Sequence, residues 1–98
     1  MRVAFTEKAQ AQFDAVLAYW DIRNQSTAYS DKLADRLENA LRMILSNPYI
    51  DIKSEFGDTR SILMENYRLY YKIDGNVIHI LSFWDTRQNP DSLLHTLQ

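Results

Sequence analysis

Residues 67–84 are YRLYYKIDGNVIHILSFW, two apolar runs joined by Asp74-Gly75. Both runs are rich in aromatic and β-branched residues, which favour β-strands. An Asp-Gly pair between such runs is the strongest short signal for a β-hairpin, because a type I′ turn needs two residues with positive φ. The stretch therefore predicts two antiparallel strands, over residues 67–73 and 77–84.

The position of the turn predicts which residues face each other. A loop at Asp74-Gly75 puts Tyr70 opposite His79 and Arg68 opposite Leu81, and alternation then separates two faces. The face expected under helices carries Tyr67, Leu69, Tyr71, Ile73, Ile78, Ile80 and Trp84. The other, at least partly open, carries Arg68, Tyr70, Lys72, His79, Leu81 and Phe83, together with Ser61 and Leu63. We expect a turn shifted by one position to remove this second surface.

The remaining sequence predicts two helices and two further strands. Residues 2–5 form a short strand, and Thr6 caps a helix that ends near Ile22. Residues 24–26 are a connector, with Ser26 as the next N-cap, and Asn47-Pro48 ends the second helix. Each helix carries one apolar stripe, and residues 60–64 form a strand. The fold class is α+β in the order β-α-α-β-β-β, with a helix hairpin packed on one face of a small, mostly antiparallel four-stranded sheet. The strand at residues 2–5 pairs with the free edge of 77–84.

Length and composition indicate one globular domain over residues 1–98. The chain has no cysteine, no N-terminal signal peptide and no apolar run of the roughly 20 residues that span a membrane, so we expect a cytoplasmic protein that does not enter membranes. The formal net charge of −2 argues against a broad nucleic-acid surface but leaves a local basic patch open. The two histidines have no nearby paired acids, and we expect neither a metal nor a cofactor.

The open face groups a cation, a phenol and an imidazole. One interpretation is a solvated sheet face, on which Arg and Lys protect an edge from aggregation. The other is a site for an anion or for a partner's segment. Both stay open from the residues alone.

Four stretches of the sequence carry a family resemblance. Residues 66–73, NYRLYYKI, and 82–90, SFWDTRQNP, resemble RelE/ParE toxins of bacterial type II toxin–antitoxin systems, as do the opening VAFTEKA at residues 3–9 and Tyr19-Trp20. The resemblance covers nearly the whole chain. It implies the same β-α-α-β-β-β fold, an antitoxin whose C-terminal segment wraps the toxin, and one of two activities: RelE-like members cut ribosome-bound mRNA, whereas ParE-like members act on DNA gyrase.

If the chain is a nuclease, the resemblance assigns catalysis to Arg68 and Arg87, and Tyr70 and His79 could supply the acid and base that RNA cleavage needs. The family uses a lysine cluster with a tyrosine, or a glutamate with a C-terminal His-Tyr pair. This sequence departs from both patterns, because Lys53 stands alone, Glu55 is a loop carboxylate and the C-terminal pair is absent.

Three functions follow as alternatives. The ParE-like, gyrase-directed toxin that inhibits growth is favoured over the RelE-like mRNA interferase and over a decayed toxin that only binds an antitoxin-like partner. The expected partners are a cognate antitoxin and either DNA gyrase or the ribosome with mRNA, in a homodimer or a toxin–antitoxin hetero-oligomer. We expect the antitoxin to contact Leu63, Lys72, Leu81 and Phe83. The free edge of the strand at 60–64 or at 2–5 is a candidate for strand addition by a partner.

Overall fold

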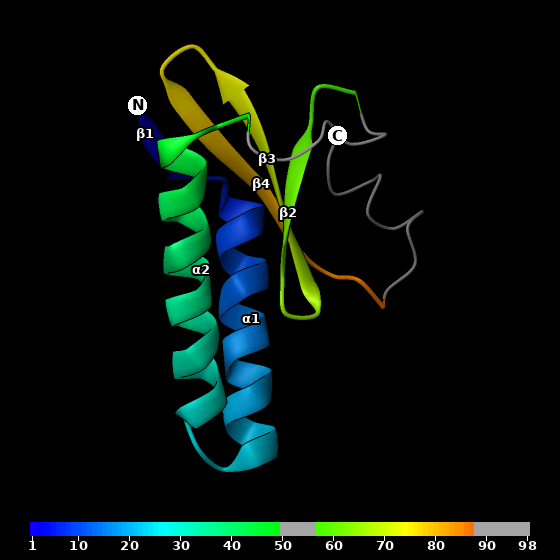
Figure 1. Cartoon of the computed structure of the whole chain (residues 1–98). Helices are drawn as coiled ribbons and strands as arrows, with labels where there is room; N and C mark the ends of the chain where they lie inside the picture. Colours follow the sequence, from blue (N-terminus) through cyan, green and yellow to red (C-terminus); the bar gives the residue numbers. More distant parts are fainter. Residues whose placement is uncertain (50–56, 88–98) are drawn as a thin grey trace.

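Two helices cover one face of a four-stranded sheet in a computed structural model that describes residues 1–49 and 57–87 (Figure 1). The elements are β1 (Arg2–Phe5), α1 (Glu7–Asn24), α2 (Ala28–Ser46), β2 (Arg60–Met64), β3 (Tyr67–Asp74) and β4 (Val77–Asp85). The sheet order is β1-β4-β3-β2, with β1 parallel to β4 and the other pairs antiparallel. The predicted fold class, element order and place of β1 are confirmed.

The helix ends follow local capping chemistry. The Thr6 hydroxyl accepts a hydrogen bond from the Ala9 N–H at 3.1 Å, as an N-cap residue should. Gln25 closes α1 in the left-handed region, with φ 51°. The prediction that Ser26 caps α2 is wrong by one residue: the N-cap is Thr27, although Ser26 Oγ still accepts from the Ala28 N–H at 3.1 Å.

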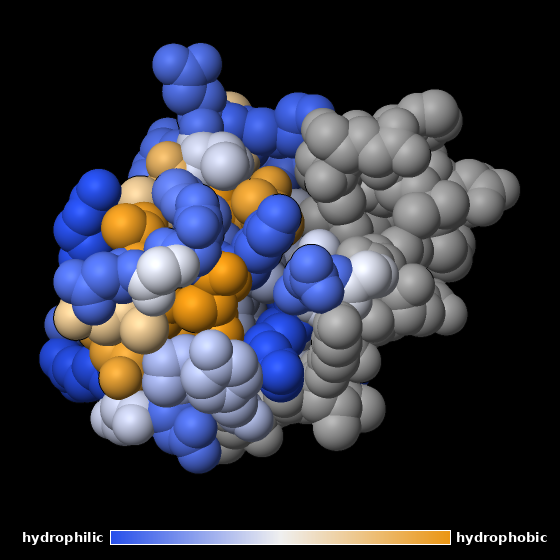
Figure 2. Space-filling view, turned by 90° about the horizontal axis from the view of Figure 1, so that it is seen from above, coloured by the Kyte–Doolittle hydropathy of each residue, from blue (hydrophilic) through white to orange (hydrophobic). Residues whose placement is uncertain are grey.

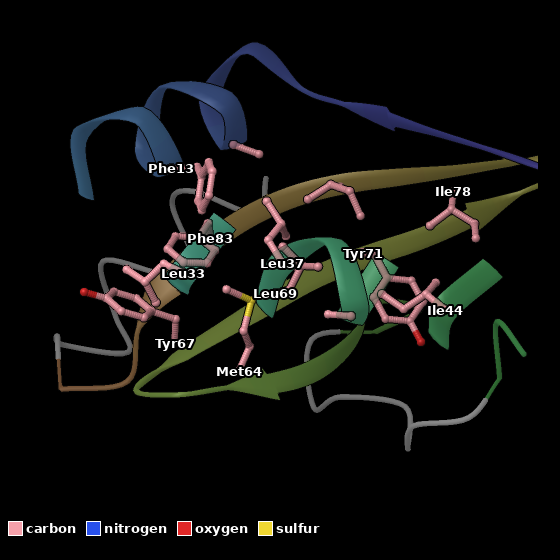
Figure 3. Close-up of a cluster of buried hydrophobic side chains, with 13 residues drawn as sticks. Phe13, Leu33, Leu37, Ile44, Met64, Tyr67, Leu69, Tyr71, Ile78 and Phe83 are labelled. Carbon is pink, nitrogen blue, oxygen red and sulfur yellow. The ribbon is translucent and has the colours of Figure 1, made fainter. Parts of the chain in front are cut away.

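The core lies between the helix pair and the sheet (Figure 3). Phe13 of α1 and Leu33, Leu37 and Ile44 of α2 are buried against the strands, as their helical spacing predicts. In the strands, the residues that face the helices alternate with residues that face away from them. The buried strand residues of this cluster are Met64, Tyr67, Leu69, Tyr71, Ile78, Ile80 and Phe83.

The turn between β3 and β4 lies one residue later than predicted. Asp74 pairs with Val77, so the two loop residues are Gly75 and Asn76. Gly75 has φ 58°, and the first loop position is where a type II′ turn needs glycine. Lys72, not Tyr70, therefore lies opposite His79. The expectation that such a shift removes the outer surface is wrong for this half of the hairpin: moving the loop by one residue on both strands changes each pairing by two positions, which keeps every side chain on its face.

A β-bulge then changes the faces in the second half of β4. Tyr71 pairs with Ile80 but Tyr70 pairs with Ser82, so Leu81 is an extra residue in β4. Beyond it the alternation is reversed. Phe83, predicted on the open face, is 2% exposed in the core, and Trp84, predicted under the helices, pairs with Arg68 on the face away from them. Both predictions are wrong because they assume unbroken alternation along β4, and no local sequence pattern indicates the bulge at Leu81.

Gln12 of α1 satisfies the backbone next to the bulge. The strand β1 ends at Phe5. The next residue, Thr6, still donates its N–H to the Ile80 carbonyl of β4 at 3.0 Å. Further along β4, Gln12 Oε1 accepts from the Phe83 N–H at 3.0 Å and from Ser82 Oγ at 3.1 Å. The Gln12 side chain thus accepts the hydrogen bond that a neighbouring strand would otherwise accept. A buried N–H needs such a partner.

Replacing Gln12 tests this bond. Gln12→Ala leaves the buried Phe83 N–H and Ser82 hydroxyl without an acceptor, so it should lower the free energy of unfolding by roughly 1–3 kcal/mol. The matched variant Gln10→Ala, on the same helix, loses only an exposed bond to Asp14 and should cost about 0.5 kcal/mol or less. Urea unfolding of both variants is the measurement; equal costs would contradict the role given to Gln12.

Candidate functional site

The outer face, meaning the sheet face away from the helices, holds most of the predicted site residues. Arg68 is half-buried and lies in a cross-strand row between Leu63 and Trp84. Its Nη1 donates to Ser61 Oγ at 2.9 Å, so the guanidinium is held against β2. The guanidinium is not under the helices, and its predicted face is correct.

The other predicted catalytic groups do not gather around Arg68. His79 lies opposite Lys72, with its Nε2 at 3.9 Å from a carboxylate oxygen of Asp74. Lys72 is four residues from Arg68 along β3, which corresponds to about 13 Å at ~3.3 Å per residue. Tyr70, between them, is buried, with 7% of its surface exposed. The predicted cluster of guanidinium, phenol and imidazole is therefore two separate groups, one near each end of β3.

The predicted partner-binding residues differ in how far they are exposed. Leu63 is 56% exposed and Lys72 is exposed, so both are available on the outer face. Leu81 is half-buried at the bulge. Phe83 cannot present its ring to a partner in this structure, because the ring stacks on Tyr67 at 4.7 Å and meets Phe13 edge-on at 5.0 Å (Figure 3).

Arg87 is bound to the end of β4. Its Nε and Nη2 donate to the two carboxylate oxygens of Asp85 at 2.9 and 2.7 Å, a bidentate pair. The side-chain hydrogen bond from Arg87 holds the pKa of Asp85 below its usual range, although partial burial opposes this shift. The same pair raises the pKa of Arg87. The charge of Arg87 is thus balanced locally.

A groove of about 400 Å³ opens beside this ion pair, between α1 and the end of the sheet. Its frame is aromatic: Trp20 Nε1 donates to the Tyr67 hydroxyl at 2.9 Å, which fixes the ring that stacks on Phe83. The lining residues are Gln12, Ala15, Val16, Tyr19, Tyr67, Phe83, Trp84, Asp85 and Arg87. We call this the β4 groove. This groove was not predicted from the sequence, in which the polar Gln12 beside the apolar stripe of α1 is its one local sign.

Some expectations fall outside the described residues or concern absences. Lys53 and Glu55 lie in the segment that the structure leaves undescribed, as does the sequence after Arg87. Within 1–49 and 57–87, no group of three or more His, Cys, Asp or Glu side chains is placed to hold a metal ion. Among the described residues, no helix combines the length and the apolar content that a membrane crossing needs.

The ion pair at the end of β4 predicts a pH dependence. Because Arg87 lowers the pKa of Asp85 in the folded protein, the pair stabilises the fold above the carboxyl's unfolded pKa of about 3.9. This contribution is lost as the pH falls through the lower, folded pKa. In Arg87→Ala, an NMR titration should find the pKa of Asp85 raised towards its ordinary value. Arg42→Ala, which breaks an exposed pair with Glu38, should leave it unchanged; an unaltered pKa in Arg87→Ala would contradict the pairing.

Comparison with known proteins gives one family and one fold. Residues 3–90 match the family described as the ParE toxin of the type II toxin–antitoxin system, parDE. A solved structure titled "Chromosomal ParDE TA system from P. aeruginosa" superposes with a TM-score of 0.73 at 19% identity, over 87% of this chain and 95% of that chain. At that identity the likeness concerns the fold. The comparison with curated proteins gives no match.

Proposed function

The chain belongs to the ParE toxin family of type II toxin–antitoxin systems, and from this membership we propose that it inhibits growth by acting on DNA gyrase and is neutralised by a cognate antitoxin. The protein then works by binding a protein target and does not cleave RNA. The observation that supports this choice is the separation of the candidate catalytic groups along β3.

Cleavage of RNA by its 2′-hydroxyl needs a base and an acid within about 3 Å of the reacting oxygens, and cations on the phosphate between them. Among residues 1–49 and 57–87, the predicted acid and base do not meet at Arg68. Its guanidinium donates to Ser61, and His79 lies opposite Lys72, four residues further along β3. Tyr70 is buried between them. Arg87 is already bound to the Asp85 carboxylate. These contacts favour a binding surface over a nuclease site.

The charge of the molecule supports the same choice. A net charge of −2 gives no general attraction for ribosomal RNA, whose binding rests on neutralised phosphates. The exposed Leu63 instead offers an apolar contact to a protein. We assign Leu63, Lys72 and Leu81 on and beside the outer face to the antitoxin contact, and omit Phe83 because it is buried.

Two assays separate the gyrase-directed toxin from the mRNA interferase. Induced expression should stop growth, and co-expression of the reading frame that neighbours the gene should restore it. The purified protein should inhibit DNA supercoiling by gyrase, while primer extension on cellular mRNA should find no new cuts. Arg68→Ala should retain growth arrest, like the control Arg42→Ala. Cuts in mRNA that vanish in Arg68→Ala alone would overturn the proposal in favour of the nuclease.

A further inference from the structure

The strand β1 lies at one edge of the sheet and leaves a row of backbone groups open. The Arg2 N–H donates to the Asn76 carbonyl at 3.1 Å and the Thr6 N–H also donates to β4, so the even-numbered residues of this segment bond to β4. Neighbouring residues of a strand turn their N–H and C=O groups to opposite sides. Val3 and Phe5 therefore direct theirs away from β4. Within residues 1–49 and 57–87, no backbone hydrogen bond reaches them on that side.

This edge has little to keep another strand away. Edge strands of natural proteins are commonly protected by lysine, proline or a β-bulge. The sequence of β1 is RVAF, which holds neither lysine nor proline, and the strand pairs with β4 without a register shift. Because β1 is only 4 residues long, its hydrogen bonds alone would hold a partner weakly. A stable partner needs apolar contact beside the edge as well.

An apolar groove of about 240 Å³ lies next to the same strand, between α1 and α2. Its apolar lining includes Phe5, Phe13, Leu37 and Leu41. Leu45 lies one helical turn beyond Leu41 on the same flank of α2, and 40% of its surface is exposed. Figure 2 shows from above that apolar side chains reach the surface among hydrophilic ones on the side of the molecule that carries the helices. We call this the β1 groove.

We propose that a second copy of this chain pairs with this edge, β1 against β1 in antiparallel orientation, about a two-fold axis at Ala4. In that register Val3 lies opposite Phe5 of the second copy, and the two residues exchange both backbone hydrogen bonds. The two sheets then form one continuous sheet. The axis is perpendicular to it, so the helices of both copies lie on the same face and the two β1 grooves lie next to the join. This inference does not depend on the proposed function.

The edge is complementary to itself in this register. Ala4 meets Ala4 of the second copy as a pair without hydrogen bonds, in which Cα atoms are only about 4.5 Å apart. Its small side chain fits this spacing on the outer face, beside His79. The exposed Arg2 comes next to the exposed Glu7 of the second copy, whereas parallel pairing would place like charges together. Lys8, the next charge, falls beyond the paired strand.

Sedimentation and hydrogen exchange test the pairing in the full chain. The chain should form a dimer that dissociates on dilution. In the dimer, the Val3 and Phe5 amides should exchange at least about tenfold more slowly than in the monomer. The Ala4 amide, which points to β4, is the internal reference and should change less. A chain that stays monomeric at about 1 mM would overturn the inference. So would a dimer in which the Val3 and Phe5 amides exchange as fast as in the monomer.

A pair of lysine variants tests the position of the axis. Ala4→Lys places two like charges at the closest point of the join and should weaken the dimer at least about tenfold. A lysine at this half-buried outer position is ordinary for the edge strand of a monomer, so the fold should tolerate it. Ala18→Lys adds the same charge at an exposed position of α1 that lines neither groove, and it should leave the dimer unchanged.

Circular dichroism checks that both variants fold. A folded Ala4→Lys that dimerises as strongly as the wild type would reject the pairing at β1. If Ala4→Lys does not fold, hydrogen exchange at Val3 and Phe5 in the wild type still decides the question.

Discussion

The extra residue at Leu81 in β4, and the Gln12 side chain that serves the backbone beside it, determine how the sheet meets the helices. Without the bulge, strict alternation would put Trp84 under α1 and Phe83 outside. With it, Phe83 enters the core against Phe13 and Tyr67. The buried Phe83 N–H lies beyond the end of the four-residue β1, so β1 cannot accept its hydrogen bond. Gln12 Oε1 accepts it instead. The packing of α1 on β4 thus depends on a hydrogen bond as well as on apolar contact.

The same constraint places the candidate site residues and the β4 groove. The bulge brings Trp84 into line with Arg68 and Leu63, and it leaves Phe83–Asp85 as an edge with a groove beside it. The displaced turn separately moves His79 opposite Lys72, away from Arg68. The cluster that sequence alternation predicts around Arg68 is therefore divided along β3, and Trp84 takes the place on the outer face that was predicted for Phe83.

Much of the fold could be predicted because its signals are local. The Thr6 cap, the Asn47-Pro48 stop, the helical stripes and the strand alternation each depend on residues close in sequence, and the element order follows from them. The faces of Arg68, Lys72 and His79 were also predictable, since a shifted loop preserves them. The bulge was not, because it is stabilised by Gln12, about seventy positions away in the sequence, and no local pattern at Leu81 encodes that bond. The β4 groove was missed for the same reason: it needs residues of α1 and of the last strand together.

The reversal of faces after Leu81 can be tested directly by nuclear Overhauser contacts in the isolated protein. The structure predicts strong contacts between the ring protons of Phe13 and Phe83, whose centroids are 5.0 Å apart, and none between Phe13 and the Trp84 indole. Contacts between Phe13 and the Trp84 indole, with the Phe83 ring free of Phe13, would show an unbroken alternation through β4 and contradict the account.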